Sequence, residues 1–263
     1  MISVTLIGAG NVGTHLYKAF QKNNQVIVKQ WFNRTLNSIS AYKNDVNITD
    51  DLSLLEDADV YIISVSDGAI ADLSTALPFQ DRLVVHTAGS INIHDLDKKH
   101  RRGVFYPLQS FTKTAHLEFA NIPICIETLD KKDYHILKAL AMALGSPVKK
   151  VNSDQRSVLH LAAVFVNNFT NQLYRVAHEI VESEATEFDL LKPLILETAR
   201  KVQHMSPYVA QTGPAKRNNV KTIKKHLALL DNDEHKEIYN LLTKSIQNTH
   251  GVSVSFNKKK KTK

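Results

Sequence analysis

The sequence predicts an α/β protein in which a doubly wound sheet is followed by an all-α domain. In the first half, short runs rich in Val and Ile alternate with helical patterns, which is typical of parallel βαβ units. A glycine-rich turn joins the first of these runs to the first helical pattern. Beyond about residue 152 only helical patterns continue.

Seven apolar runs are predicted as strands. They cover Ile2–Ile7, Gln25–Phe32, Val46–Ile48, Val60–Val65, Leu83–His86, Val104–Leu108 and Ile122–Glu127. Because these runs show little polar alternation, we expect a sheet that is covered on both faces.

Helices are predicted between the strands and throughout the second half. Those of the first half are expected at Asn11–Gln21, Leu36–Lys43, Gly68–Leu77 and Lys131–Leu144. In the second half a long helix, capped by Ser153 or Asp154, should run to Ser183, followed by helices at Glu187–His204, Val220–Leu230 and Glu234–Asn248. We therefore expect an α/β domain over residues 1–152, a helical domain over 153–257 and a disordered basic tail over 258–263.

Composition and charge argue against several classes of protein. The net charge of +7 invites a nucleic-acid partner, but five lysines among the last six residues supply most of it, so we do not favour one. Cys125 is the only cysteine, which excludes an intrachain disulfide, and no metal-ligand spacing is present. The N-terminus lacks the positive start of a signal peptide, and no run approaches the roughly 20 apolar residues that span a membrane. We expect a cytoplasmic protein without a metal.

The sharpest motif lies between the first strand and the first helix. It consists of Gly8, Ala9, Gly10, Asn11, Val12 and Gly13. In a Rossmann-type fold the first glycine makes the tight turn, the second lets a pyrophosphate approach the backbone, and the third lets the helix pack against the sheet. The helix N-terminus then offers N–H groups to the phosphates. The motif predicts a dinucleotide cofactor bound by the α/β domain.

The residues after the second strand favour NADP over NAD. An NAD site usually has a carboxylate there that binds the ribose 2′-hydroxyl group, whereas this chain has Asn33, Arg34 and Thr35. A guanidinium group can pair with a 2′-phosphate, which a carboxylate would repel. The alternative is that Arg34 is an ordinary surface arginine.

Two further loops are predicted to reach the cofactor, because ligands of doubly wound sheets lie beyond the carboxyl ends of the strands. Val65, Ser66 and Asp67 follow the fourth strand, and Asp67 has the alternative role of a helix cap. Thr87, Ala88 and Gly89 follow the fifth, where their small side chains would let the nicotinamide end come close. A simple turn is the alternative there.

With these residues considered, the chain resembles bacterial NADP-dependent oxidoreductases that join a Rossmann-like domain to a helical domain of unassigned function. This group is related to 6-phosphogluconate dehydrogenase, pyrroline-5-carboxylate reductase and ketopantoate reductase. The matching stretches are GAGNVG at 8–13, NRT at 33–35, HTAGS at 86–90, YPLQSF at 106–111 and TGPAKRNN at 212–219. The resemblance covers both domains and implies NADP binding and a reductase.

Two departures from the family pattern stand out. The family usually has His before Pro-Leu-Gln, where this chain has Tyr106. It also tends to have Gly-Asp after the Thr-Gly-Pro segment, where this chain has Asn218 and Asn219. If either lost group matters for chemistry, the activity is altered.

The long predicted helix carries the candidate catalytic residues. His160, Asn167, Asn171 and His178 fall within roughly 20° of one line along an ideal helix. No charged residue lies between Ser157 and Tyr174, so this line suits a cleft or an interface as well as solvent. The opposite side is expected to be the core face; it holds Ala162, Phe165, Phe169, Val176 and Ile180.

If the line faces a cleft, His160 is the best general acid, because the pKa of a free imidazole suits proton exchange near neutral pH. Asn167 or Asn168 would hold the substrate. Lys216 and Arg217 follow a rigid Gly-Pro turn and could bind a substrate anion, with ordinary surface charge as the alternative. Lower-ranked substrate contacts are His86, Tyr106 and Gln109.

The sequence thus predicts an NADPH-dependent reductase that transfers a hydride to a small carbonyl or imine substrate in a cleft between the two domains. A non-catalytic NADP-binding sensor or scaffold is the alternative. The helical domain is also expected to form a homodimer.

Overall fold

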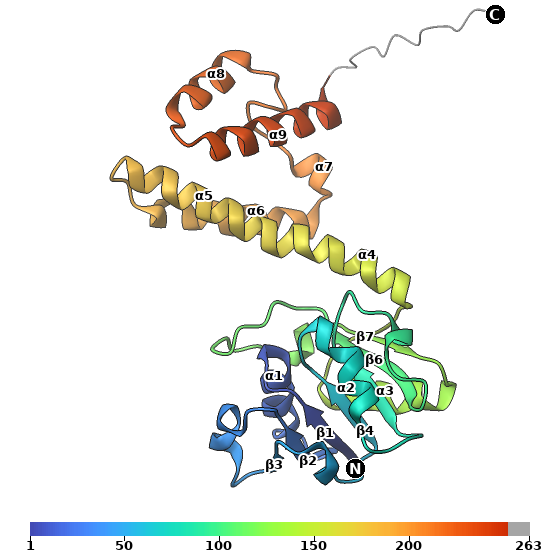
Figure 1. Ribbon diagram of the computed structural model, residues 1–263. Helices are drawn as coiled ribbons and strands as arrows, with labels where there is room; N and C mark the ends of the chain where they lie inside the picture. The colour runs from blue at the N-terminus through green and yellow to red at the C-terminus, as the bar shows by residue number, and fades with distance from the viewer. Residues whose placement is uncertain (252–263) are drawn as a thin grey trace, which may run out of the picture. The chain divides into compact units, whose positions relative to one another are not determined.

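The computed structural model describes residues 1–251 of the chain, and its N-terminal half is built on an eight-stranded sheet (Figure 1). The strand order is β3-β2-β1-β4-β5-β6-β7-β8. The strands are β1 (Ile2–Ile7), β2 (Val26–Phe32), β3 (Asn47–Thr49), β4 (Val60–Ile63), β5 (Leu83–His86), β6 (Arg101–Pro107), β7 (Ile124–Thr128) and β8 (Val148–Lys150). Only the β6–β7 pair is antiparallel among these strands. The order reverses between β1 and β4, so the predicted Rossmann-like fold is confirmed.

Helices bury both faces of this sheet, as the apolar strands predict. One cluster of buried side chains joins β1 and β6 to α1 (Asn11–Phe20) and α3 (Lys131–Ala143). A second cluster, on side chains of the opposite pleat, joins β1 and β4 to α2 (Ile70–Ala76). β4 and β5 are buried along their whole length, which explains their lack of polar alternation.

Three local predictions differ from the structure. The helix expected at 36–43 is replaced by two single 3-10 turns, η1 (Leu36–Ser38) and η2 (Ser40–Tyr42). The short edge strand β8 was not predicted. The cap of the long helix is Asn152 rather than Ser153 or Asp154, because its side chain accepts the N–H of Gln155 while the Gln155 side chain accepts the N–H of Asn152.

The long predicted helix is interrupted by a π-turn. α4 (Ser153–Ala163) continues into η7 (Val164–Phe169), which is π-helical, and then into α5 (Thr170–Ser183). Within this stretch the described chain divides into two compact units, the first over residues 1–168 and the second beginning at Phe169. α4 therefore belongs to the first unit, although the predicted domain boundary at residue 152 coincides with its start.

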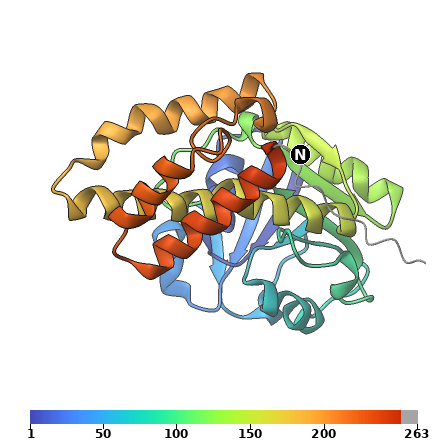
Figure 2. The same cartoon turned by 90° about the horizontal axis from the view of Figure 1, so that it is seen from above.

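The second unit is helical, as expected. Its elements are α5, η8 (Phe188–Leu191), α6 (Lys192–His204), α7 (Pro207–Ala210), α8 (Val220–Leu229) and α9 (Asp233–His250). Figure 2 shows α5 and α6 joined at one end through η8, and α8 lying beside α9. His235 on α9 contacts Glu179 on α5 at 3.2 Å, which ties these two helices together.

The side of the long predicted helix that was expected to be the core face is mostly exposed from η7 onward. Val176 is buried, whereas Phe165, Phe169 and Ile180 are 61%, 49% and 39% exposed. The predicted basic tail, residues 258–263, lies outside the described residues. Across residues 1–251, the helices are too short or too polar to cross a membrane.

Candidate active site

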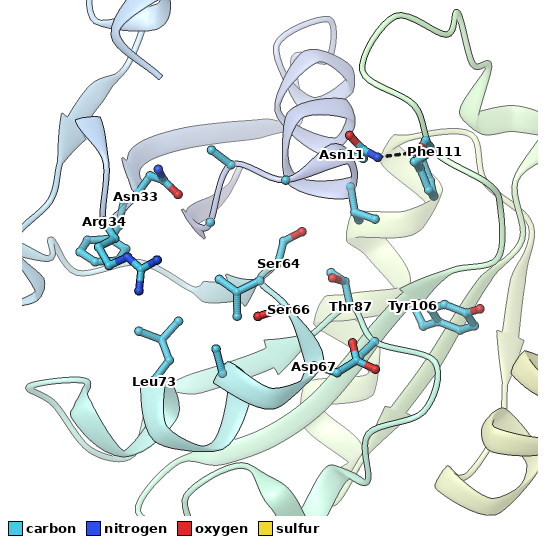
Figure 3. Close-up of a pocket in the computed structure, with 18 of the residues that line it drawn as sticks. Asn11, Asn33, Arg34, Ser64, Ser66, Asp67, Leu73, Thr87, Tyr106 and Phe111 are labelled. Carbon is cyan, nitrogen blue, oxygen red and sulfur yellow. Dashed lines mark hydrogen bonds between the residues drawn. The ribbon is translucent and has the colours of Figure 1, made fainter. Parts of the chain in front are cut away.

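A cavity of about 1220 Å³ lies in the first unit, where the strands β1, β4, β5 and β6 end (Figure 3). Each predicted loop contributes to its wall. The lining residues that the sequence analysis named are Gly8, Ala9, Gly10, Asn11, Val12, Asn33, Arg34, Val65, Ser66, Asp67, Thr87, Ala88, Gly89, Tyr106, Gln109 and His160. The structure therefore brings most of the predicted cofactor residues and one predicted catalytic residue into one cavity.

The glycine turn has the geometry that the motif predicts. Gly8 has φ +107°, and a Cβ there would collide with the carbonyl oxygen of Ser64 and lie 2.7 Å from Val65 Cγ1. A Cβ on Gly13 would lie 2.6 Å from the carbonyl oxygen of Gly8, so only glycine fits beneath the turn. Gly13 does not line the cavity. Gly10 has open space, with Ser64 oxygen 3.8 Å from its virtual Cβ.

These features fit a pyrophosphate group. Gly10 precedes the first turn of α1, which contains no acidic residue, and its missing side chain leaves the N–H groups of that turn accessible. The fully buried Trp31 holds the turn from behind, because its Nε1–H donates to the carbonyl oxygen of Gly8 over 2.9 Å. The turn would therefore hold the phosphates, with the rest of the cofactor along the strand ends.

The end of the cavity that follows β2 and β3 carries both signs of charge. Arg34 is exposed and lines the wall together with Asn33, whose amide donates to the carbonyl oxygen of Thr35. The Thr35 side chain does not line the cavity; Thr35 is the cap residue of η1. Asp50 and Asp51, which the sequence analysis missed, also line this end. They follow β3, so its position beside β2 was the signal that could have identified them.

Tyr106 and His160 meet at the opposite end of the cavity. Tyr106 Oη lies 3.3 Å from Nδ1 of His160. A Cβ on Gly89 would lie 2.6 Å from the same nitrogen, so only glycine lets the imidazole ring approach the loop after β5. Burial raises the pKa of Tyr106 to about 12, so its hydroxyl group is protonated at neutral pH. Asp67 accepts a hydrogen bond from the hydroxyl group of Ser90 beside this pair.

A buried ion pair that the sequence analysis missed fixes the start of α4. Arg156 is fully buried and donates to the carboxylate of Glu127, to the carbonyl oxygen of Ile91 and to Ser153 Oγ. Ser153 also donates to Glu127 through its N–H and its hydroxyl group. His160 lies about one helical turn beyond Arg156, so these contacts fix the position of the backbone that carries the imidazole ring.

A segment after β6 crosses the glycine turn. Asn11 Nδ2 donates to the carbonyl oxygen of Phe111 over 2.7 Å, and His15 Nε2 lies 2.8 Å from that of Thr112 (Figure 3). Gln109 and Phe111 line the cavity on this side. The amide side chain of Asn11 therefore ties the segment to α1, while its backbone N–H belongs to the glycine turn.

His86 was expected to contact the substrate, but the structure places its side chain in the interior. It is fully buried and absent from the cavity wall, and its Nδ1 accepts the N–H of Ala88 over 3.2 Å. Burial, with the positive charge of Arg156 nearby, lowers the pKa of His86 to about 3. The ring is therefore neutral at physiological pH and serves the packing of β5.

The remaining candidates are not among the residues that line this cavity. Asn167 and Asn168 are exposed in η7. Lys216 and Arg217 belong to the second unit, where Lys216 Nζ donates to the carbonyl oxygen of Gln211. Within residues 1–251, no group of three or more His, Cys, Asp or Glu side chains could hold a metal ion.

Two family models match this chain. Residues 3–89 match the family model described as NADP oxidoreductase, coenzyme F420-dependent, and residues 122–246 match a domain of unknown function, DUF2520. A search of curated proteins finds no match.

Three solved structures are similar over both halves of the chain. A provisionally assigned NADP oxidoreductase from Bacteroides fragilis shares 40% identity and a TM-score of 0.84, covering 94% of this chain and 98% of its own. A reductive aminase from Aspergillus terreus, solved with NADPH and ethyl levulinate, has 12% identity and a TM-score of 0.71, covering 95% of each chain. A pyrroline-5-carboxylate reductase from Coxiella burnetii has 16% identity and a TM-score of 0.56, covering 94% of this chain and 96% of its own. The last two similarities concern the fold alone.

Proposed function

The chain belongs to the oxidoreductase family of the Bacteroides fragilis protein, and we propose that it is an NADPH-dependent reductase of a small carbonyl or imine substrate. The observation that carries the proposal is that the glycine turn and the Tyr106–His160 pair line one cavity. When bound, the reduced nicotinamide supplies a hydride to the substrate carbon. The protein must then orient the substrate and deliver a proton to its heteroatom.

The preference for NADPH rests on Arg34. Its guanidinium group and the amide of Asn33 line the adenosine end directly after β2, where an NAD site would carry a carboxylate. A hydrogen bond to a charged group contributes about 1.5–3 kcal/mol, which corresponds to a roughly 10- to 150-fold change in affinity. Asp50 and Asp51 oppose this preference, although Asp51 is engaged as the cap of η3 (Leu52–Leu54).

Replacing Arg34 tests this preference directly. We expect Arg34→Ala to raise the Kd for NADPH by about 10- to 100-fold and to leave the Kd for NADH within about twofold, because only NADPH carries the 2′-phosphate. Titration can be followed by fluorescence of Trp31, the only tryptophan. Arg82→Ala is a matched control, since Arg82 is partly exposed, pairs with Asp57 and lies outside the cavity wall. Equal dissociation constants of the wild type for the two cofactors would refute the preference.

His160 is the proposed proton donor to the heteroatom. Its ring lines the cavity beside Tyr106, which Figure 3 shows on the side opposite Arg34. The nicotinamide ring would lie there if the adenosine were beside Arg34. Asn167 or Asn168 as substrate contacts, Lys216 and Arg217 as an anion site, and the cleft between domains stay predictions from the sequence.

Transfer of a labelled hydride tests the reductase itself. NADPH carrying deuterium at C4 is mixed with the protein and a panel of small ketones and cyclic imines, with ethyl levulinate included, and the label is sought in the product. We expect transfer to at least one member and a loss of about 100-fold or more in His160→Ala, the usual scale for a general acid. Tight NADPH binding without any transfer would favour the sensor alternative.

We also propose a cytoplasmic homodimer. Several large apolar side chains of the second unit are exposed, among them Leu190, Leu194, Leu229 and Leu241 at 63–77%. Exposed apolar surface of this extent is typical of an interface. A mass corresponding to one chain in light scattering at micromolar concentration would contradict the dimer.

A further inference from the structure

We propose that Tyr106 is a positioning residue that fixes the tautomer of His160, so that the neutral ring carries its proton on Nε2 and presents it to the substrate. The inference rests on the proposed reductase function and concerns the residue at which this chain departs from the family pattern. The ring nitrogen that carries the proton of a neutral histidine is set by the hydrogen bond at the other nitrogen. Here that other nitrogen is Nδ1, 3.3 Å from Tyr106 Oη.

The surroundings of Tyr106 make its hydroxyl group the donor in this hydrogen bond. The side chain is buried and belongs to an apolar cluster with Ile93, Val104 and Cys125. Within residues 1–251, Nδ1 of His160 is the only hydrogen-bond partner of its hydroxyl group. If Nδ1 carried the proton, the hydroxyl proton would have no acceptor on the protein among residues 1–251, and a largely buried donor without a protein acceptor disfavours that arrangement.

The remaining contacts hold the imidazole ring next to the hydroxyl group of Tyr106. Arg156 and Glu127 fix the start of α4 below the ring, and Gly89 lies against Nδ1 with no side chain to displace it. The two rings meet edge to face, with centroids 6.2 Å apart and planes at 75°. Among the described residues Nε2 of His160 has no partner, so its N–H is available to a substrate in the cavity.

This arrangement also balances the proton transfer. The heteroatom of the reduced group takes the Nε2 proton, Nδ1 takes the hydroxyl proton of Tyr106, and the ring stays neutral throughout. Tyr106 is left as a tyrosinate, which regains a proton from water. Burial disfavours this anion most, and Asp67 adds to the effect, whereas Arg156 favours it, so the tyrosinate is a short-lived state that takes up a proton readily.

Nitrogen NMR tests the tautomer without a substrate. The full-length protein labelled with ¹⁵N in histidine is measured with NADP⁺ bound, and His160→Gln identifies the signals of that ring. We expect an unprotonated Nδ1 and a protonated Nε2 in the wild type, and a mixture of tautomers in Tyr106→Phe. Tyr61→Phe is the matched control, because Tyr61 is a buried tyrosine of the neighbouring strand β4 that bonds to Glu56 and lies outside the cavity wall. It should leave the His160 signals unchanged.

A protonated Nδ1 in the wild type, or His160 signals unaffected by Tyr106→Phe, would overturn the inference. NADP⁺ affinity of the Tyr106→Phe variant within about twofold of the wild type shows that the cavity is intact; if that variant does not fold, the wild-type spectrum alone decides. Failure of the reductase proposal gives a different result, since the expected tautomer would then be present without hydride transfer to any substrate.

Discussion

Gly8 and Gly10 should separate the folding of the glycine turn from cofactor binding. Gly8→Ala puts a side chain at φ +107° and a Cβ against the carbonyl oxygen of Ser64. A residue held in such a backbone conformation costs about 1–3 kcal/mol, and the collision adds to it, so we expect a loss of about 2–4 kcal/mol in the free energy of unfolding. Gly10→Ala has φ −71° and no atom within 3.8 Å of the new Cβ, so we expect stability within about 0.5 kcal/mol of the wild type.

NADPH affinity should be lowered in the stable variant, Gly10→Ala. The methyl group of Gly10→Ala occupies the open side of the turn, so we expect a fold that melts normally but binds NADPH at least tenfold more weakly. Thermal unfolding measures the first quantity and a Trp31 fluorescence titration the second; a loss of 2–4 kcal/mol corresponds to a drop in Tm of roughly 4–16 °C. A Gly10→Ala variant that binds NADPH like the wild type would refute the assignment of the turn to the pyrophosphate.

Two further predictions concern the buried charges behind the cavity. Arg156→Met leaves the Glu127 carboxylate without its ion-pair partner, so we expect a loss of about 3–5 kcal/mol in the free energy of unfolding by guanidinium chloride. The double variant Arg156→Met with Glu127→Gln should recover part of this loss. Equal losses in the single and double variants would contradict the pairing. His86 has a pKa of about 3 when folded against about 6.5 when unfolded, so below pH 6.5 only the unfolded chain binds the proton. The contribution of neutral His86 to the free energy of unfolding is therefore complete above pH 6.5 and falls by about 1.4 kcal/mol per pH unit between pH 6 and pH 4. His86→Gln should reduce this slope in a pH series of unfolding measurements. A variant with the same pH dependence as the wild type would contradict the prediction.

The cofactor end of the site was predictable because its determinants are local. Each glycine of the turn has a role that depends only on the strand before it and the helix after it, and Arg34 lies directly after the second strand. Asp50 needed one further step, because it reaches this end only through the pairing of β3 with β2, which the strand order of a doubly wound sheet supplies and the local sequence does not.

The strand ends show a different limit. His86 was assigned to the cavity because it ends the fifth strand, yet the side chain lies in the interior. In a strand with one exposed face, polar alternation reveals which residues point outward. β5 is buried on both faces, so its sequence carries no such signal. The contact of Tyr106 with His160 could not be derived from either residue, because the two lie 54 residues apart and meet only when α4 packs against the end of β6.

The π-turn explains why the polar line on the long helix was only partly useful. The line from His160 to His178 assumes a rotation of about 100° per residue throughout. A π-helical turn closes its hydrogen bonds one residue later than an α-helical turn, so the rotation per residue falls and every later side chain is displaced around the axis. His160 precedes η7 and lines the cavity of the first unit. Asn167 and Asn168 lie inside η7, and His178 follows it. Periodicity therefore located the one candidate that lies before the interruption, and the face beyond Val164 must be inferred from contacts rather than from spacing.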